Sequence, residues 1–436
     1  MGGSTAVVRR PPGPTEPIEL RADGDTLTDL LAVRQAHGNF SYLRTPRGRH
    51  VYFVNEPQAV RRILVRDHEK YVKGPGFERV KLLLGNGIFV SDGDHWRRAR
   101  TMAQPGFTRK NLAHLIELIV AAVHRRADTW RDAVERGDSI DITTEMSDFA
   151  LELILRALFG ADYDAHIVTD GENPFAFLSE EFSRDINLVL KFRALRDLIL
   201  SLVERRRNDA ERTDLDFLSV YMGAVDKNGE PFNDRDLLDE IMTLIIAGFE
   251  TSAGTLNWAW ALIAGHPEVA ERIVEEATSV LPDDRLPTRE HLGRLVYLEQ
   301  VINETMRLYP PGWIFSRRSV VDQELGSYDV PAETDIYISP YILHRTAEYW
   351  PEPERFDPER FAEDRLTDDA QAAFIPFSLG PRRCIGEYFA MMEMKLNLAL
   401  LVPQFRLQRA EDALPELDLG INLRSKGSIW LKPARR

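Results

Sequence analysis

The sequence predicts a mainly α-helical protein with a small β-rich portion. From Glu56 onward, apolar residues recur with helical spacing over most of the chain. The stretch from about 233 to 264 contains no proline and predicts one helix about 48 Å long, which has to cross the whole molecule. Residues 313–340, in contrast, combine short alternating runs with turn residues and are typical of strands.

The other elements can be assigned in chain order. Residues 1–25 are rich in proline, glycine and charge, so we expect a flexible arm followed by a single domain over 26–436. Strand-like runs on both sides of a Pro-Arg-Gly turn predict a hairpin. The β-rich parts therefore span about 38–56 and about 313–340. Apolar spacing predicts further helices, at about 108–135, 145–159, 267–280, 292–308 and 384–401, with two more inside 174–210.

Composition excludes several classes of protein. The 436 residues carry 55 Lys and Arg against 69 Asp and Glu, a net charge of −14, and only one cysteine, Cys384. One cysteine forms neither an internal disulfide nor a cysteine-rich zinc site. An acidic chain is a poor general binder of nucleic acid. Because the sequence shows no signal peptide and no apolar run of about 20 residues, we expect a cytoplasmic protein without a membrane span.

The residues around Cys384 indicate a ligand site. Gly380 and Gly386 remove side chains on either side, so the backbone can come close to something flat and bulky. We expect Cys384 at the N-terminus of the last helix, where the positive end of the helix dipole favours a thiolate. Arg382 and Arg383 add cations beside it. Together these features suit a large planar anion, although a lone cysteine is more often an ordinary buried residue.

The segment 377–386, Phe-Ser-Leu-Gly-Pro-Arg-Arg-Cys-Ile-Gly, resembles the haem-binding loop of the cytochrome P-450 family, the haem-thiolate monooxygenases. The resemblance implies that family's fold, with the long helix over haem b and with the cysteine loop and last helix beneath it. It also implies that Cys384 binds the haem iron and Arg382 a propionate, in a loop that begins at Phe377 and ends at Gly386. Ser378 replaces a glycine of many members, and we expect no loss of haem binding from so small a side chain.

A second segment of the same family lies midway along the long helix. Ala247-Gly248-Phe-Glu250-Thr251 resembles the oxygen-binding segment. The resemblance implies that Ala247 and Gly248 leave room for O2 beside the haem and that Glu250 and Thr251 relay protons. Without that context, the same residues fit a close helix crossing in which Thr251 bonds back to the Ala247 carbonyl.

A third resemblance concerns charged residues before the cysteine. Glu304-Thr-Met-Arg307 resembles the family's ExxR motif, and the segment 356–361, Phe-Asp-Pro-Glu-Arg-Phe, supplies a third member, Arg360. The implied triad of Glu304, Arg307 and Arg360 fixes the loop before the cysteine. Arg355 is the competing candidate, and the full hexapeptide favours Arg360. By spacing alone, Glu304 and Arg307 form an ordinary helix ion pair, worth about 0.2–0.5 kcal/mol if exposed.

The fourth resemblance is to the family's WxxxR motif. Trp96-Arg-Arg-Ala-Arg100 places Trp96 and Arg100 on one helical face, where the resemblance implies that they hold a propionate. Arg317, seven residues after Pro310, matches a less specific propionate-binding position. The competing interpretation of the Trp96 segment is an amphipathic helix with a solvated basic face.

Taken together, the resemblance implies an O2-dependent monooxygenase of the bacterial type that hydroxylates or epoxidises a lipophilic small molecule, such as a fatty acid, terpenoid or polyketide. The chain offers no flavin or iron–sulfur segment, so we expect electrons from a separate ferredoxin and ferredoxin reductase, and a monomeric enzyme. A haem-thiolate sensor without turnover, and a peroxide-driven or phenol-coupling oxidase, are the alternatives. Four cations are candidates for a basic docking patch on the cysteine side: Arg97, Arg98, Lys110 and Arg383.

The resemblance also indicates where the substrate pocket lies. Its lining corresponds to four mostly apolar stretches, 73–88, 174–190, 239–251 and 311–315. Three bulky side chains are expected beside the haem: Trp313, Ile314 and Phe315. Four charged residues are candidates for contacts to a polar end of the substrate, or else exposed faces of helices: Glu180, Glu181, Arg184 and Lys191.

Overall fold

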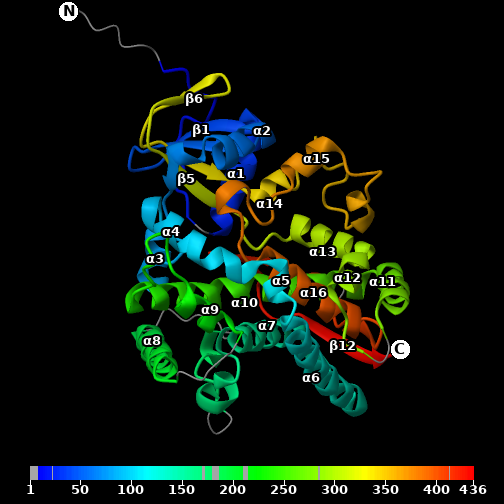
Figure 1. The fold of residues 1–436 in the computed structure, drawn as a ribbon. Coiled ribbons are helices and arrows are strands. Elements are labelled where there is room, and N and C mark those ends of the chain that lie inside the picture. The colour runs from blue at the N-terminus through cyan, green and yellow to red at the C-terminus, as the bar shows by residue number, and fades with distance from the viewer. Residues whose placement is uncertain are drawn as a thin grey trace, which may run out of the picture. The chain divides into compact units, whose positions relative to one another are not determined.

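A computed structural model describes seven stretches of the chain: residues 8–21, 23–168, 172–178, 186–209, 215–282, 285–411 and 413–436. The chain divides into two compact units, which we describe separately. Unit 1 comprises Met1–Glu78, Asn303–Cys384 and Glu416–Arg424. Unit 2 comprises Arg79–Ile302, Ile385–Pro415 and Ser425–Arg436. The chain passes between them inside helices α3 (Phe77–Leu84) and α13 (Val296–Leu308) and at three other points. Figure 1 labels both helices. The single domain expected over 26–436 stays a prediction.

Unit 1 is built on a five-stranded mixed sheet. Its strand order is β1 (Phe40–Arg44), β2 (His50–Val54), β8 (Asp335–Ile338), β5 (Phe315–Ser319) and β3 (Tyr71–Lys73). The β1–β2 hairpin pairs Phe40 with Val54 and Arg44 with His50. Strand β2 runs parallel to β8, and the β8–β5 and β5–β3 pairs are antiparallel. The β-rich parts that the sequence predicts, 38–56 and 313–340, therefore meet in one sheet, and Gln323–Leu325 and Tyr328–Val330 pair separately as a two-stranded sheet.

The core of unit 1 lies between this sheet and short helices. Tyr52, Val54, Ile336, Ile338 and Trp350 belong to one buried apolar cluster. The remaining elements of the unit are short, apart from α1. They are α1 (Gly24–His37), α2 (Pro57–Arg61), η1 (Arg62–Arg66), η2 (His68–Lys70), β6 (Gln323–Leu325), β7 (Tyr328–Val330), α14 (Pro340–Leu343), η6 (Pro358–Phe361), α15 (Asp368–Ala373), η7 (Gly380–Arg382), β10 (Leu417–Leu419) and its partner β11 (Leu423–Ser425).

The N-terminal segment is attached to this sheet. The Arg9 carbonyl accepts the Asp329 N–H at 2.9 Å, and the Pro12 carbonyl accepts the Tyr42 N–H at 2.8 Å. The Ile18 N–H donates to the Arg44 carbonyl at 2.9 Å. These bonds tie residues 9–18 to β1 and β7, in contrast to the flexible arm expected for 1–25. The sequence could not show this, because the bonds use backbone groups that any residue carries.

Unit 2 is organised around the long helix α10 (Asp234–Gly265), which extends one residue beyond the predicted end. The Asn233 side chain caps its first turn by accepting the Asp236 N–H at 2.9 Å. Helix α7 (Ile142–Phe159) packs closely on α10. The two helices approach at Gly248, where an added Cβ would lie 2.9 Å from the Ile154 side chain. A glycine at this point therefore lets two helix backbones come together.

The other elements of unit 2 are mostly helices. They are α4 (Gly93–Ala103), η3 (Gln104–Phe107), α5 (Arg109–Leu112), α6 (Leu115–Arg136), η4 (Tyr163–Ile167), η5 (Ala176–Leu178), α8 (Ile186–Arg207), α9 (Phe217–Gly223), α11 (Pro267–Val280), α12 (Arg289–Arg294), α16 (Glu387–Leu401) and a sheet of order β4 (Ile140–Asp141), β12 (Trp430–Arg435), β9 (Phe405–Arg409). Two predicted helices, 108–135 and 292–308, are each broken once. At the second break, the Glu276 carboxylate accepts the N–H groups of Tyr297 and Leu298 at 2.6 and 2.9 Å and so caps α13.

A buried charge network joins three helices of unit 2. The guanidinium of Arg206, on α8, bonds Asp162 at 2.7 Å and both carboxylate oxygens of Asp216. It also donates to the Phe159 carbonyl, at the C-terminus of α7, at 2.7 Å. These side chains are at most 5% exposed. Asp216 in turn caps α9 by accepting the Ser219 N–H at 2.8 Å. Every member is therefore paired in a water-excluded environment.

We expect Arg206→Ala to destabilise the fold strongly, because it leaves two buried carboxylates without their cation. Such a loss is worth about 3–5 kcal/mol of unfolding free energy. Urea unfolding followed by circular dichroism measures it. Arg136→Ala is the matched control, because the Arg136–Asp138 pair is exposed and should contribute little. Equal midpoints for the two variants would contradict a structural role for the Arg206 network.

Candidate functional site

Glu304 and Arg307 form a fully buried ion pair in unit 1. Both side chains are 0% exposed. Arg307 Nε and Nη2 donate to the two carboxylate oxygens of Glu304 at 2.7 and 2.9 Å, a bidentate arrangement. Burial raises the pKa of Glu304 above its ordinary value, and the hydrogen bonds and charge of Arg307 oppose this rise. The pair is therefore not the exposed helix ion pair that spacing alone suggests.

Arg307 also holds the chain after helix α14. Its Nη1 donates to the carbonyls of His344 and Pro353 at 2.9 and 2.7 Å, and its Nη2 to the Arg355 carbonyl at 3.2 Å. With the two bonds to Glu304, all five N–H donors of this guanidinium are used. The Arg307 side chain thus connects helix α13 to the backbone at His344 and to the backbone at 353–355.

Arg360 is the third member of this group. Its Nε lies 3.3 Å from Glu304 Oε1, and the side chain is 8% exposed. Its Nη atoms donate to the carbonyls of Pro351 and Glu352, the latter at 2.7 Å. The competing Arg355 side chain is 63% exposed and pairs with Glu352. The structure therefore brings Glu304, Arg307 and Arg360 together and leaves the Arg355 guanidinium outside.

The cysteine loop of unit 1 has an unusual backbone. Ser378 and Gly380 adopt positive φ angles of 59° and 70°. A Cβ at Gly380 would lie 2.1 Å from the Leu64 carbonyl oxygen, so only glycine fits there. The Cys384 N–H donates to the Phe377 carbonyl at 2.9 Å, which closes the loop. These features hold the eight residues 377–384 in one compact conformation.

Cys384 itself is exposed, which differs from the ordinary buried cysteine. The last helix, α16, begins at Glu387 and not at Cys384, with Gly386 in the N-cap position. The cysteine therefore precedes the helix cap by two residues and follows the turn η7 at Gly380–Arg382. An exposed thiol on a fixed loop fits a haem iron, which needs one soft thiolate from the protein.

The four predicted propionate contacts are all buried or half-buried. In unit 1, Arg317 is 6% exposed, and its Nη1 donates to the Ser316 carbonyl at 2.8 Å. In unit 2, Trp96 is 9% exposed on α4, and Arg100, one turn later, is half-buried. Arg100 lies near Tyr221: burial raises the pKa of Tyr221, and the charge of Arg100 opposes this rise. Arg382, in η7, is half-buried.

The middle of α10 is the least buried part of an otherwise buried helix. Residues 237–245 and 255–263 are all buried, whereas Ala247 is exposed and Glu250 and Thr251 are half-buried. Thr251 Oγ1 donates to the Ala247 carbonyl at 2.9 Å. A Cβ added at Gly248 would meet Ile154 on α7, so the small size of this residue serves helix packing, and its expected place beside O2 stays a prediction. The exposed face is thus carried by Ala247, Glu250 and Thr251.

An acidic anchor on α10 was not predicted from the sequence. Asp239 Oδ2 accepts the Asn86 N–H at 2.7 Å, and its Oδ1 lies 3.2 Å from Arg196 Nη2 on α8. The neighbouring Glu240 accepts the Ile88 N–H, and burial raises its pKa to about 8. These contacts join loop 85–88 to α10. The sequence feature that could have indicated this anchor is the pair of adjacent acids inside an apolar run. Their partners belong to or follow the Gly-Asn-Gly sequence at 85–87.

Several other expected site residues make contacts of their own or lie outside the described residues. Trp313 is fully buried and donates to the Gly420 carbonyl at 3.0 Å, so it lines no open pocket. Arg98 is bound to Asp226 at 2.8 Å and to the Pro231 carbonyl, which removes it from the expected basic patch. Lys191 lies 4.9 Å from the centre of the Phe177 ring. The remaining candidates for a polar contact lie outside the described residues: Glu180, Glu181 and Arg184.

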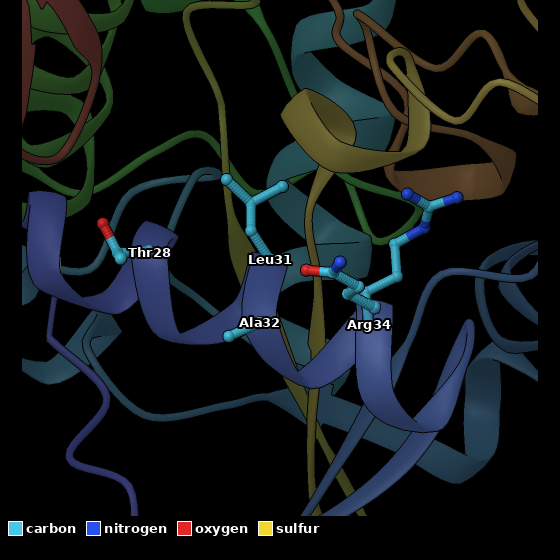
Figure 2. Close-up of a pocket in the computed structure, with 5 residues that line it drawn as sticks. Thr28, Leu31, Ala32 and Arg34 are labelled. Carbon is cyan, nitrogen blue, oxygen red and sulfur yellow. The ribbon is translucent and has the colours of Figure 1, made fainter.

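Figure 2 shows an open depression on helix α1, which no predicted site residue lines. Its lining is Thr28, Leu31, Ala32, Arg34 and Gln35. In the described part of the chain, no three His, Cys, Asp or Glu side chains cluster closely enough to hold a metal ion. Within the same residues, no helix combines the length and apolar character needed to cross a bilayer.

We expect Gly85→Ala to detach loop 85–88 from α10. Gly85 has φ +81°, and an added Cβ would lie 2.0 Å from Oδ1 of Asp239. Asn86 holds the other oxygen of this carboxylate, Oδ2, and Arg196 holds Oδ1. The cost is about 1–3 kcal/mol. Hydrogen exchange should be faster at the Asn86 amide. Gly137→Ala is the control, because φ is +75° there and nothing lies near the added Cβ. Similar exchange at Asn86 in both variants would refute the anchor.

Comparison with known proteins agrees with this geometry. A sequence model of the cytochrome P-450 family matches residues 19–430. The chain is 32% identical over 397 residues to a cyclooctatin synthase of Streptomyces melanosporofaciens, covering 87% of this chain and 85% of the relative. A cyclooctat-9-en-7-ol 5-monooxygenase of the same organism is also 32% identical, over 87% of this chain and 84% of the relative. A pentalenene oxygenase of Streptomyces avermitilis is 31% identical over 401 residues, 88% of this chain and 87% of the relative. The chain therefore belongs to the cytochrome P-450 family and is a haem-thiolate monooxygenase that uses haem b and O2.

Proposed function

We propose that this enzyme hydroxylates or epoxidises a lipophilic small molecule of the terpenoid class. The exposed Cys384 carries the proposal, because its loop is fixed by the Gly380–Leu64 contact and closed by the Phe377 carbonyl. Relatives named for pentalenene and for cyclooctat-9-en-7-ol favour terpenoids over the fatty acids and polyketides that also fit a mostly apolar pocket.

In the proposed site, the Cys384 thiolate binds the haem iron, and Arg382 and Arg317 bind propionates. Trp96 and Arg100 are the proposed propionate contacts of unit 2. When bound, haem supplies O2 activation, and the electron density of the thiolate favours cleavage of the O–O bond. The protein residues hold the group, exclude water and move protons. Electrons come from a separate donor, for which a ferredoxin with its reductase is our proposal.

Glu250 and Thr251 are the proposed proton relay. The Thr251 hydroxyl proton is bound by the Ala247 carbonyl, which orients the oxygen lone pairs of Thr251 to accept a hydrogen bond. Glu250, the preceding residue, is a carboxyl that can hold and release a proton. Both lie on the only less buried stretch in the centre of α10, among described residues. These observations support a relay that passes protons toward a ligand bound against Ala247.

Spectroscopy of the purified, haem-loaded protein tests the proposed function. The reduced protein should give the thiolate-type CO spectrum, and Cys384→Ala should lose it. Cyclic terpenes should then displace water from the iron and shift the Soret band of the oxidised protein. Product analysis with a surrogate ferredoxin and reductase identifies the inserted oxygen. A Cys384→Ala protein with an unchanged CO spectrum, or shifts with fatty acids alone, would overturn the corresponding part of the proposal.

We expect Thr251→Val to uncouple electron use from product formation. This variant removes the hydroxyl and keeps the side-chain volume, so loss of the relay should lower product formed per NADPH by roughly 10-fold or more, as for other positioned acid–base groups. The missing electrons should appear as hydrogen peroxide. Thr251→Ser keeps the hydroxyl and should remain close to the unmodified enzyme. Equal coupling in the two variants would count against the relay.

A further inference from the structure

His344 connects the buried ion pair of unit 1 to the cysteine loop. It follows α14 and is fully buried. Its ring packs on Phe374, with centroids 5.2 Å apart. Its Nε2 lies 3.0 Å from the backbone nitrogen of Ile375, and its own carbonyl accepts Arg307 Nη1 at 2.9 Å. One residue therefore receives a bond from the ion pair and makes another to the segment before Cys384.

Ile375 is the first residue of the turn that leads into the loop. Its carbonyl accepts the Ser378 N–H at 3.1 Å, and its N–H is taken by His344. The next residue, Pro376, has no N–H, and the Phe377 carbonyl accepts the Cys384 N–H. The His344 bond is thus a tie from outside the loop to the turn in which Cys384 is anchored.

We propose that His344 is a positioning residue that fixes the start of the cysteine loop by accepting the Ile375 N–H at Nε2. The inference deepens the proposed function and rests on it only for the role of Cys384. Neither the family match nor the sequence motifs assign a role to this histidine. Its position is set from two sides, by Arg307 on its carbonyl and by Phe374 on its ring.

The protonation state of His344 agrees with an acceptor at Nε2. A neutral imidazole with its proton on Nδ1 leaves Nε2 free to accept. Burial, followed by the charges of Arg307 and Arg345, lowers the pKa of His344 to about 3. Backbone hydrogen bonds to Met306 and Arg307 oppose that fall in the pKa, as expected if a ring N–H donates to these carbonyls. An imidazole can accept the Ile375 N–H at Nε2 and still donate from its other nitrogen, which an apolar ring of this size cannot do.

Two substitutions separate the hydrogen bond from the packing. His344→Phe keeps a ring against Phe374 and removes the acceptor, whereas His344→Gln places an amide oxygen near the position of Nε2. Thr346→Val is the matched control, because its hydroxyl makes a buried bond to the Ile342 carbonyl in the same turn, away from the loop. Hydrogen exchange at the Ile375 amide is the primary measurement. It is read both in the haem-loaded protein and in the protein stripped of haem.

We expect Ile375 to exchange on the order of 10-fold to 100-fold faster in His344→Phe, and close to the unmodified rate in His344→Gln and Thr346→Val. Amides of α6, in unit 2, should be unaffected in all three. In the haem-loaded protein, His344→Phe should convert part of the reduced CO complex from the thiolate-type to the thiol-type spectrum. Unchanged exchange and an unchanged spectrum in His344→Phe would overturn the proposal.

Nitrogen NMR of the unmodified protein, as its diamagnetic ferrous CO complex, gives a test that needs no variant. His344 should show an unprotonated Nε2 and a protonated Nδ1 at neutral pH. A proton on Nε2 would overturn the proposal even if His344→Phe fails to fold. Failure of the proposed function is distinguishable, because a chain that never gives the thiolate-type spectrum can still show the His344-dependent exchange of Ile375.

Discussion

The bidentate contact between Glu304 and Arg307 is the interaction on which the rest of unit 1 depends. Taking both charges out of water is costly, and the pair repays that cost only because every remaining donor is satisfied. Arg307 does this by binding three backbone carbonyls, and Arg360 adds a second cation to Glu304. The segment 344–360 carries few regular hydrogen bonds of its own. Its conformation therefore depends on these two guanidinium groups.

The cysteine loop likewise keeps its conformation because polar contacts from outside the loop hold it. Positive φ angles at Ser378 and Gly380 are unfavourable for most residues, and the loop keeps them because its ends are bound from outside. Leu64 fills the space next to Gly380, and His344 takes the N–H of Ile375. A rigid loop matters for a metal ligand, because a small displacement of the sulfur changes the bond to iron. Rigidity here comes from buried polar contacts around the loop and not from a helix behind Cys384.

The sequence predicted those features that depend on local patterns. The absence of proline predicted α10 to within one residue at its C-terminus, and alternation predicted the two parts of the sheet. It could not predict contacts made by single backbone groups, such as those of residues 9–18. Nor could it tell that Gly248 faces α7 or that Trp313 is core, because both depend on which face of an element meets a neighbour. The acids Asp239 and Glu240 were overlooked because an acid inside an apolar helix is identified by its partners.

In each unit, a more exposed segment that carries proposed site residues is held by buried polar groups. In unit 1 the exposed Cys384 is supported by Glu304, Arg307 and His344. In unit 2 the less buried face at Ala247 and Thr251 is adjoined by Ser252, which is buried and donates to Glu393 on α16. Burial raises the pKa of Glu393 to about 8, and the Ser252 bond opposes that rise, so this carboxyl is largely neutral near pH 7. The Ser252 bond to Glu393 thus ties α16 to the face of α10 next to Glu250 and Thr251, where proton transfer is proposed.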